Sequence, residues 1–202
     1  PPPPRYGARC IMNLCFKNND NRTSVMGAGG PTVLVNAMKT FPDEAGVQSF
    51  ACGALANLAH SDADVGIAIA RDGGVDAVLM ALRTFSAGSA SGRHRVLQKA
   101  CWAMLAMASS DLVASHIASR GGLEAVVAAM RSSDRAEVQA FGAWALANIA
   151  WSDPDVQQRA IDCGALEVCE TALERHGASS AEVASKADLA LKTITAVNRQ
   201  RA

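Results

Sequence analysis

One apolar stretch occurs three times in this sequence and constrains the fold more than any other feature. Its copies are VQSFACGALANLA at 47–59, VLQKACWAMLAMA at 96–108 and VQAFGAWALANIAW at 138–151. Partial copies stand near both ends of the chain, GARCIMNLC at 7–15 and VASKADLALKTIT at 183–195. Copies of one helix bury their apolar faces against one another, so the pattern predicts a stacked array of repeats.

Two shorter segments precede each full copy. A polar residue opens a short helix, glycines end it, and a second helix follows, which begins at Pro31 in the first unit. We expect Asp62 (or Ser61), Asp111 and Asp153 to cap the short helices, because an Asp side chain accepts hydrogen bonds from the free amides there.

The glycines also give the length of the repeat. The register glycines are 44, 48 and 42 residues apart, and they are Gly30, Gly74, Gly122 and Gly164. Spacings in this range are typical of two- or three-helix α-solenoid repeats.

These marks predict five divisions of the chain. Residues 1–17 form a Pro-rich start and the third helix, from Arg5 to Lys17, of an incomplete repeat. Four full repeats follow at 18–61, 62–109, 110–152 and 153–202, the last with a C-terminal cap. Segment 86–92, SAGSASG, is expected to be an exposed loop outside helix and core, because Gly and Ser dominate it. The start within a repeat indicates a fragment of a longer protein.

Composition excludes several classes of protein. The formal net charge is zero, which argues against nonspecific binding to nucleic acid. The six Cys residues form no CxxC pair, and most stand at small apolar positions of the repeats. Buried free thiols are ordinary in a reducing compartment, so we expect an intracellular, cytoplasmic location, with the nucleus possible. No run of eighteen apolar residues predicts a membrane span.

The order of short helix, Gly-Gly, second helix, polar turn and long helix ending in A-L-x-N-L-A resembles the armadillo repeat family. The resemblance covers nearly the whole chain. It implies an all-α, right-handed solenoid whose third helices line a concave groove that binds extended peptides. A protein-protein interaction scaffold or adaptor without enzymatic activity is therefore the expected function.

The resemblance also implies which residues contact the peptide. Positions four apart share one face of a helix, and the groove-facing strips include Arg9, Ser49 and Gln98. The family's Asn, which binds the ligand backbone through its amide, matches Asn13, Asn57 and Asn148. Trp102 and Trp144 match a Trp ladder found in importin-α-like members. The alternatives are that each Asn bonds a neighbouring carbonyl and that each Trp fills the gap between repeats.

Two departures limit the match to importin-α. Ala106 replaces the Asn beside Trp102, and Gly53 replaces the Trp beside Asn57. The strips contain no Asp or Glu, while the N-terminal end is basic, with Arg5, Arg9 and Lys17. A neutral or acidic peptide therefore fits better than the basic peptides of nuclear import, which are the second hypothesis. The third is a structural spacer or self-assembly segment, with homo-oligomers formed through the N-terminal end.

No catalytic or metal site can be assembled from the sequence. The four His residues lie in different units, at 60, 94, 116 and 176, without the spacing of metal ligands. We expect no cofactor, no metal and no enzymatic activity.

Overall fold

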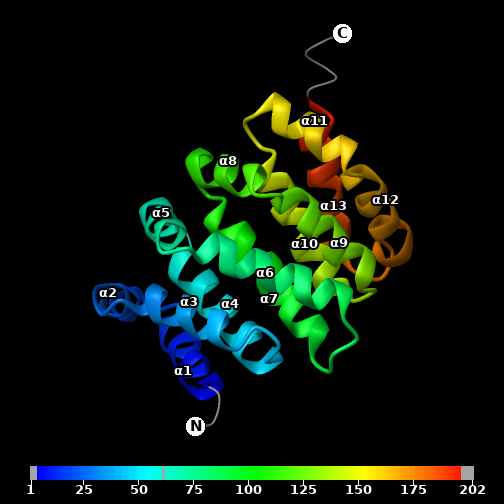
Figure 1. Cartoon of the computed structure of the whole chain (residues 1–202). Coiled ribbons are helices and arrows are strands. Elements are labelled where there is room, and N and C mark those ends of the chain that lie inside the picture. The colour runs from blue at the N-terminus through cyan, green and yellow to red at the C-terminus, as the bar shows by residue number, and fades with distance from the viewer. Residues whose placement is uncertain (1–3, 61, 197–202) are drawn as a thin grey trace.

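The computed structural model describes residues 4–60 and 62–196, and within them the chain forms thirteen α-helices and no strand (Figure 1). The helices are α1 (Arg5–Cys15), α2 (Asn19–Gly27), α3 (Gly30–Thr40), α4 (Ala45–Ala59), α5 (Ala63–Arg71), α6 (Gly74–Ala87), α7 (Arg93–Met107), α8 (Asp111–Ser119), α9 (Gly122–Ser132), α10 (Ala136–Ile149), α11 (Pro154–Asp162), α12 (Ala165–His176) and α13 (Ala181–Ile194).

The helices build three parallel rows. The third helices α1, α4, α7, α10 and α13 pack side by side in chain order. The second helices α3, α6, α9 and α12 pack over them, and the first helices α2, α5, α8 and α11 lie along one edge (Figure 1). Helices α1 and α13 are therefore at opposite ends of the stack. The residues at which one repeat ends and the next begins stay a prediction.

Side-chain caps start each first helix. The Asp62 and Asp153 carboxylates accept hydrogen bonds from backbone amides, as expected. The expectation for α8 is wrong, because Ser110 is its cap and accepts from the amide of Val113 at 3.3 Å. Asp111 is instead the first helical residue, where its charge is favourable near the helix N-terminus, and its Oδ1 accepts from the Ser152 hydroxyl at 2.8 Å.

Left-handed glycines join each first helix to its second helix. They have φ angles of 73°, 85°, 82° and 87°, and they are Gly29, Gly73, Gly121 and Gly164. Gly164 is thus equivalent to the first glycine of the earlier pairs, whereas the sequence register aligned it with the second. The spacings between equivalent residues are therefore 44, 48 and 43.

The second glycine of each pair is required by close packing. A Cβ on Gly122 would overlap the Ile117 side chain and lie 2.7 Å from the Ile117 carbonyl oxygen, and Gly74 has the same relation to Ile69. In the last unit Ala165 takes this position, and the residue five before it is Ala160. Ala160 has no γ-carbons, so the side chain that obstructs the other units is absent there.

The inner third helices α4, α7 and α10 form much of the core and are buried on most sides. All residues from Ala51 to Ala59 of α4 are buried, and most of them are Ala, Gly, Cys or Leu. Small side chains let neighbouring helices approach closely, and close packing maximises dispersion contacts. Four of the six thiols are buried and free, those of Cys15, Cys52, Cys101 and Cys169. Burial raises the pKa of Cys101 to about 12.

Two predicted boundaries differ from the structure. Helix α6 continues through Ser86 and Ala87, so the predicted loop begins only at Gly88. Phe85, which is 2% exposed, anchors this last turn in the core and outweighs the weak helix preference of Ser. Helix α1 ends at Cys15 instead of Lys17, and Lys17 adopts a left-handed φ of 51°. No helix among the described residues is both long and apolar enough to cross a bilayer.

The glycine contact gives a stability prediction. Gly122→Ala is expected to lower the free energy of unfolding by about 1–3 kcal/mol, because the added methyl overlaps Ile117 in a packed region. Urea unfolding followed by circular dichroism measures the change. Gly27→Ala is the control, because nothing lies within 4 Å of a Cβ at that position. Equal stability of the two variants would contradict the proposed overlap.

Candidate functional site

Four pairs of residues connect successive third helices along one face, which we call the third-helix face. Each pair joins two neighbouring third helices. The second member lies three residues before the position of its own helix that is equivalent to the first member. The pairs are Arg9 with Phe50, Gly53 with Lys99, Trp102 with Phe141, and Trp144 with Lys186. Because the same contact recurs, the four pairs form a continuous line across all five third helices.

Three of the pairs involve an aromatic ring. The Trp102 and Phe141 ring centroids are 6.1 Å apart with an interplanar angle of 38°. Lys186 Nζ lies 3.5 Å from the centroid of Trp144, and the Arg9 guanidinium carbon lies 5.7 Å from that of Phe50. These distances are in the range of aromatic and cation–π attraction. Both Trp side chains thus fill gaps between repeats, and both are also half-buried and accessible from this face.

Gly53 is glycine because its neighbours occupy the space of a side chain. A Cβ there would lie 2.6 Å from Met12 Sδ of α1 and 3.5 Å from Lys99 Cδ of α7. A Trp at this position would need both side chains to move. The Lys99 stem therefore occupies space that a larger side chain at Gly53 would need, and its Nζ lies 4.7 Å from the Trp102 centroid.

The structure places the three Asn residues in different surroundings. Asn57 is 5% exposed, and its Nδ2 donates to the Met12 carbonyl oxygen at 2.7 Å. Asn148 is half-buried, and its Nδ2 makes a longer contact of 3.5 Å with the Leu105 carbonyl oxygen. Asn13 is exposed. The alternative role, bonding a neighbouring carbonyl, is therefore present at Asn57 and in a weaker form at Asn148.

The remaining predicted ligand contacts also differ in accessibility. Arg9 is exposed and Gln98 is half-buried, so both are available on the third-helix face. Ser49 is only 1% exposed, and its Oγ lies 3.4 Å from the Gly46 carbonyl oxygen. The expectation that Ser49 contacts a ligand is therefore corrected, because α4 is packed between α1 and α7 at this position.

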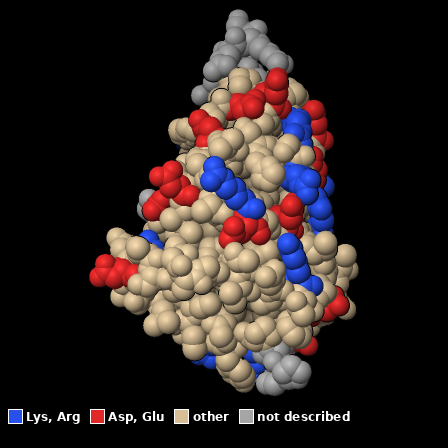
Figure 2. Space-filling model, turned by 60° about the vertical axis from the view of Figure 1, so that its left-hand side comes forward, with Lys and Arg blue, Asp and Glu red and all other residues tan. Residues whose placement is uncertain are grey.

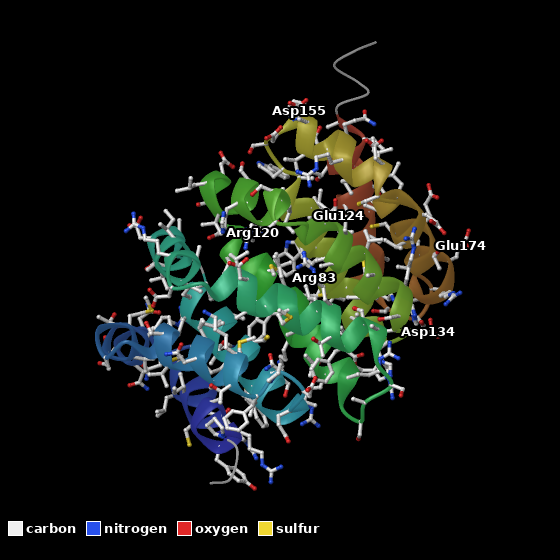
Figure 3. All side chains as sticks on the ribbon, viewed as in Figure 1. Arg83, Arg120, Glu124, Asp134, Asp155 and Glu174 are labelled. Atoms are coloured by element: carbon white, nitrogen blue, oxygen red, sulfur yellow. The ribbon has the colours of Figure 1, made fainter. Side chains whose placement is uncertain are left out.

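Several charges of the first and second helices and of the turns that follow them are paired between units, and Figure 3 labels Arg120, Glu124 and Asp134 among them. The ion pairs join neighbouring units at 2.7 to 3.6 Å, and they are Arg120–Asp76, Arg131–Glu167, Arg159–Glu124 and Arg175–Asp134. On the third-helix face, by contrast, no ion pair among the described residues includes Arg9, Arg95, Lys99 or Lys186.

The half-buried ammonium of Lys99 shows the effect of this imbalance. Burial lowers the pKa of Lys99, and the positive charge of Arg95 lowers it further. Both effects disfavour the charged amine, since burial removes hydrating water and a like charge repels it.

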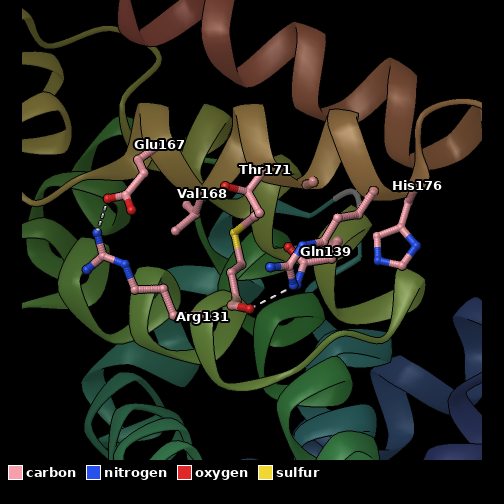
Figure 4. Close-up of a pocket in the computed structure, with 9 residues that line it drawn as sticks. Arg131, Gln139, Glu167, Val168, Thr171 and His176 are labelled. Carbon is pink, nitrogen blue, oxygen red and sulfur yellow. Dashed lines mark hydrogen bonds and ion pairs between the residues drawn. The ribbon is translucent and has the colours of Figure 1, made fainter.

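A hollow of about 210 Å³ between α9, α10 and α12 is separate from this face (Figure 4). Arg131 and Glu167 pair across one side of it at 2.7 Å. Gln139 Nε2 donates to the Met130 and Ser133 carbonyl oxygens at 2.9 and 2.5 Å. His176 Nε2 lies 3.3 Å from Asp134 Oδ1. The polar groups around the hollow thus interact mainly with other residues of the chain.

The other His residues suggest no chemistry. His94 Nδ1 is 2.8 Å from the Ser133 hydroxyl. Within residues 4–60 and 62–196, no three His, Cys, Asp or Glu side chains are grouped so that they could hold a metal ion.

Comparison with known proteins identifies the fold. No protein-family model and no curated protein sequence matches the chain. An engineered protein of known structure matches with a TM-score of 0.82 and 28% identity, over 94% of this chain and 74% of its own. A second engineered protein gives 0.78 and 30%, over 95% of this chain and 44% of its own, so the chain spans less than half of it. A designed armadillo repeat protein in complex with the peptide (KR)4 gives 0.75 and 23%, over 94% of this chain and 74% of its own.

The chain has the armadillo repeat fold. This confirms the predicted all-α, right-handed solenoid. The roles of the Trp and Asn residues of this armadillo chain stay predictions.

Sequence reasoning missed one row of the third-helix face. Phe50, Lys99 and Phe141 stand three residues before Gly53, Trp102 and Trp144, and Lys186 stands three residues before Leu189, the equivalent residue of α13. The signal was available, because aromatic and basic residues alternate at this position from repeat to repeat. It was missed because only positions four apart within one helix were compared, and contacts between helices were not.

The Asn57 contact predicts a role in stability. Asn57→Ala is expected to cost about 1–2 kcal/mol of unfolding free energy, because it leaves the Met12 carbonyl without its donor. Chemical denaturation measures the loss. The matched control, Asn13→Ala on the exposed face of α1, should change stability by less than about 0.5 kcal/mol. If Asn57→Ala were as harmless as the control, the bond between α1 and α4 would not contribute.

Proposed function

We propose that this armadillo chain is a non-enzymatic scaffold that binds an extended segment of a partner protein along the third-helix face. The observation that carries the proposal is the accessibility of three predicted residues on adjoining helices. Trp102 of α7 and Trp144 of α10 are half-buried, and so is Asn148, one turn after Trp144. Aromatic faces bind aliphatic stems, and an amide can both donate to and accept from a peptide backbone.

Proteins of the same fold support this proposal. One similar structure is the designed armadillo repeat protein solved with the peptide (KR)4, and another belongs to a set designed for modular peptide recognition. The latter matches with a TM-score of 0.77 and 21% identity over 96% of this chain. At such identity the match shows the fold alone, so peptide binding by this chain rests on its own residues.

The Asn residues have unequal parts in this proposal. Asn13 and Asn148 can offer both atoms of the amide to a peptide backbone. One N–H of the Asn57 amide is already bonded to Met12 and the side chain is only 5% exposed, so Asn57 contributes least to ligand binding. Arg9 and Gln98 add polar contacts at the edges of the strip. An intracellular location remains part of the proposal, since free buried thiols suit a reducing compartment.

Binding can be tested with labelled peptides. Wild-type protein is titrated into fluorescent peptides of alternating Asp and Glu, alternating Ser and Thr, and alternating Lys and Arg, and anisotropy is recorded. The double variant Trp144→Ala with Asn148→Ala is expected to weaken binding at least about tenfold, because it removes one packing surface and one backbone contact. Met80→Ala with Leu112→Ala is the control, because both side chains are large, apolar and exposed on other helices. Equal affinities of the two double variants would exclude the third-helix face.

A second candidate function is self-association at the N-terminal end of the stack. Tyr6 and Leu14 of α1 are 61% and 54% exposed, and Phe16, directly after the helix, is 57% exposed. Figure 2 shows a broad area without charged side chains over the lower half of one face, where the N-terminal helices lie. Exposed apolar side chains such as these three mark an interaction surface in many proteins.

Light scattering at increasing concentration tests self-association. The wild-type mass is expected to rise with concentration, and Leu14→Glu with Phe16→Glu should keep the protein monomeric, because charge opposes apolar burial. Val33→Glu provides a control on another exposed apolar residue. A monomeric wild type at all concentrations would reject this candidate while leaving peptide binding open.

A further inference from the structure

The aromatic rings of the third-helix face already bind cations of the chain itself. Lys186 lies 3.5 Å from the Trp144 centroid, Lys99 lies 4.7 Å from that of Trp102, and Arg9 lies 5.7 Å from that of Phe50. A Lys or Arg of a ligand would have to displace these groups to reach the same rings. It would also approach like charges, which repel it.

These cations differ from the arginines of the first and second helices that form ion pairs. The arginines of the second and first helices, such as Arg120 and Arg131, bind carboxylates of neighbouring units. Within the part of the chain that the structure describes, Arg9, Arg95, Lys99 and Lys186 have no such partner. The third-helix face therefore presents positive charge that the fold itself leaves uncompensated.

Stacking on a ring also holds these cations in place. A Lys side chain loses conformational freedom when it is ordered. Lys186 on Trp144 and Lys99 on Trp102 are ordered before any ligand arrives, so less of this loss falls on binding. The cations are thus positioned as donors for an incoming carboxylate.

We propose that the segment bound by this face is acidic, and that its carboxylates bind Lys99 and Lys186, with Arg9 and Arg95 extending the same charge. The proposal rests on the proposed function, whose ligand class it names. A carboxylate between Lys99 and Arg95 relieves the repulsion between them and compensates the half-buried amine. Charge-assisted hydrogen bonds of this kind are among the stronger polar contacts in proteins.

Two carboxylates restrict where the acidic segment can bind on the third-helix face. Glu137 and Glu182 are exposed and stand one turn before Phe141 and Lys186 on α10 and α13. Neither forms an ion pair with a described lysine or arginine. They repel an acidic ligand at the starts of these helices, and so direct it along the middle turns where the lysines lie.

The same three peptides test whether this face prefers an acidic or a basic ligand. Wild-type protein is expected to bind the Asp/Glu peptide at least about tenfold more tightly than the Lys/Arg peptide at low salt, and to lose this preference as salt screens the charges. Lys99→Met with Lys186→Met should weaken binding of the Asp/Glu peptide about tenfold or more, because Met keeps the apolar stem and removes the charge. Lys39→Met with Arg71→Met is the control, since it changes the net charge equally on other helices.

A variant with reversed charge distinguishes loss of the cation from loss of folding. Lys186→Glu is expected to weaken binding of the Asp/Glu peptide and to strengthen binding of the Lys/Arg peptide, and its thermal unfolding should match that of Lys186→Met. Unchanged binding of the Asp/Glu peptide in the Lys99/Lys186 variant, or tighter wild-type binding of the Lys/Arg peptide, overturns the acidic assignment alone. Binding of no peptide by wild type overturns the proposed function together with it.

Discussion

Contact between successive third helices is the interaction on which the rest of this structure depends. Helices α4, α7 and α10 are surrounded by other helices, and their small side chains allow a close approach that larger residues would prevent. The second helices cover one side of this row, and the first helices close its edge. Each unit is therefore stabilised mainly by its neighbours, as expected for a repeat array.

The same contacts that build the row also shape its accessible face. Trp102 packs on Phe141 and Trp144 packs under Lys186, so each ring joins two units while one part of it stays exposed. Asn57 illustrates the opposite outcome, because its amide is taken up by Met12 and its side chain is nearly inaccessible. Structural and binding roles thus compete for one set of positions, and burial decides which role each residue can have.

The fold could be predicted from the sequence because the repeat multiplies weak signals. Glycine pairs, caps and apolar stretches recur in phase, so a single misplaced residue, such as the cap at Ser110, does not change the architecture. The site was harder to predict. Ser49 shares a helical face with Asn57, but α1 and α7 enclose that part of α4, and this enclosure follows from three helices that are far apart in sequence. The cation on Trp144 comes from the next unit, so no pattern within one helix reveals it.

The alternation of aromatic and basic residues along the third helices means that the units are not interchangeable. Each unit supplies one member of a pair to the unit before it and one to the unit after it. If segment 110–152 were duplicated in tandem, the new Phe141 would face the old Trp144, as Phe141 now faces Trp102. The lengthened protein would gain an aromatic stack but no further lysine, and Lys99 and Lys186 would lie one unit further apart. Reuse of these repeats would therefore change the spacing of the lysines along the face, and the order of units sets where the positive charge lies.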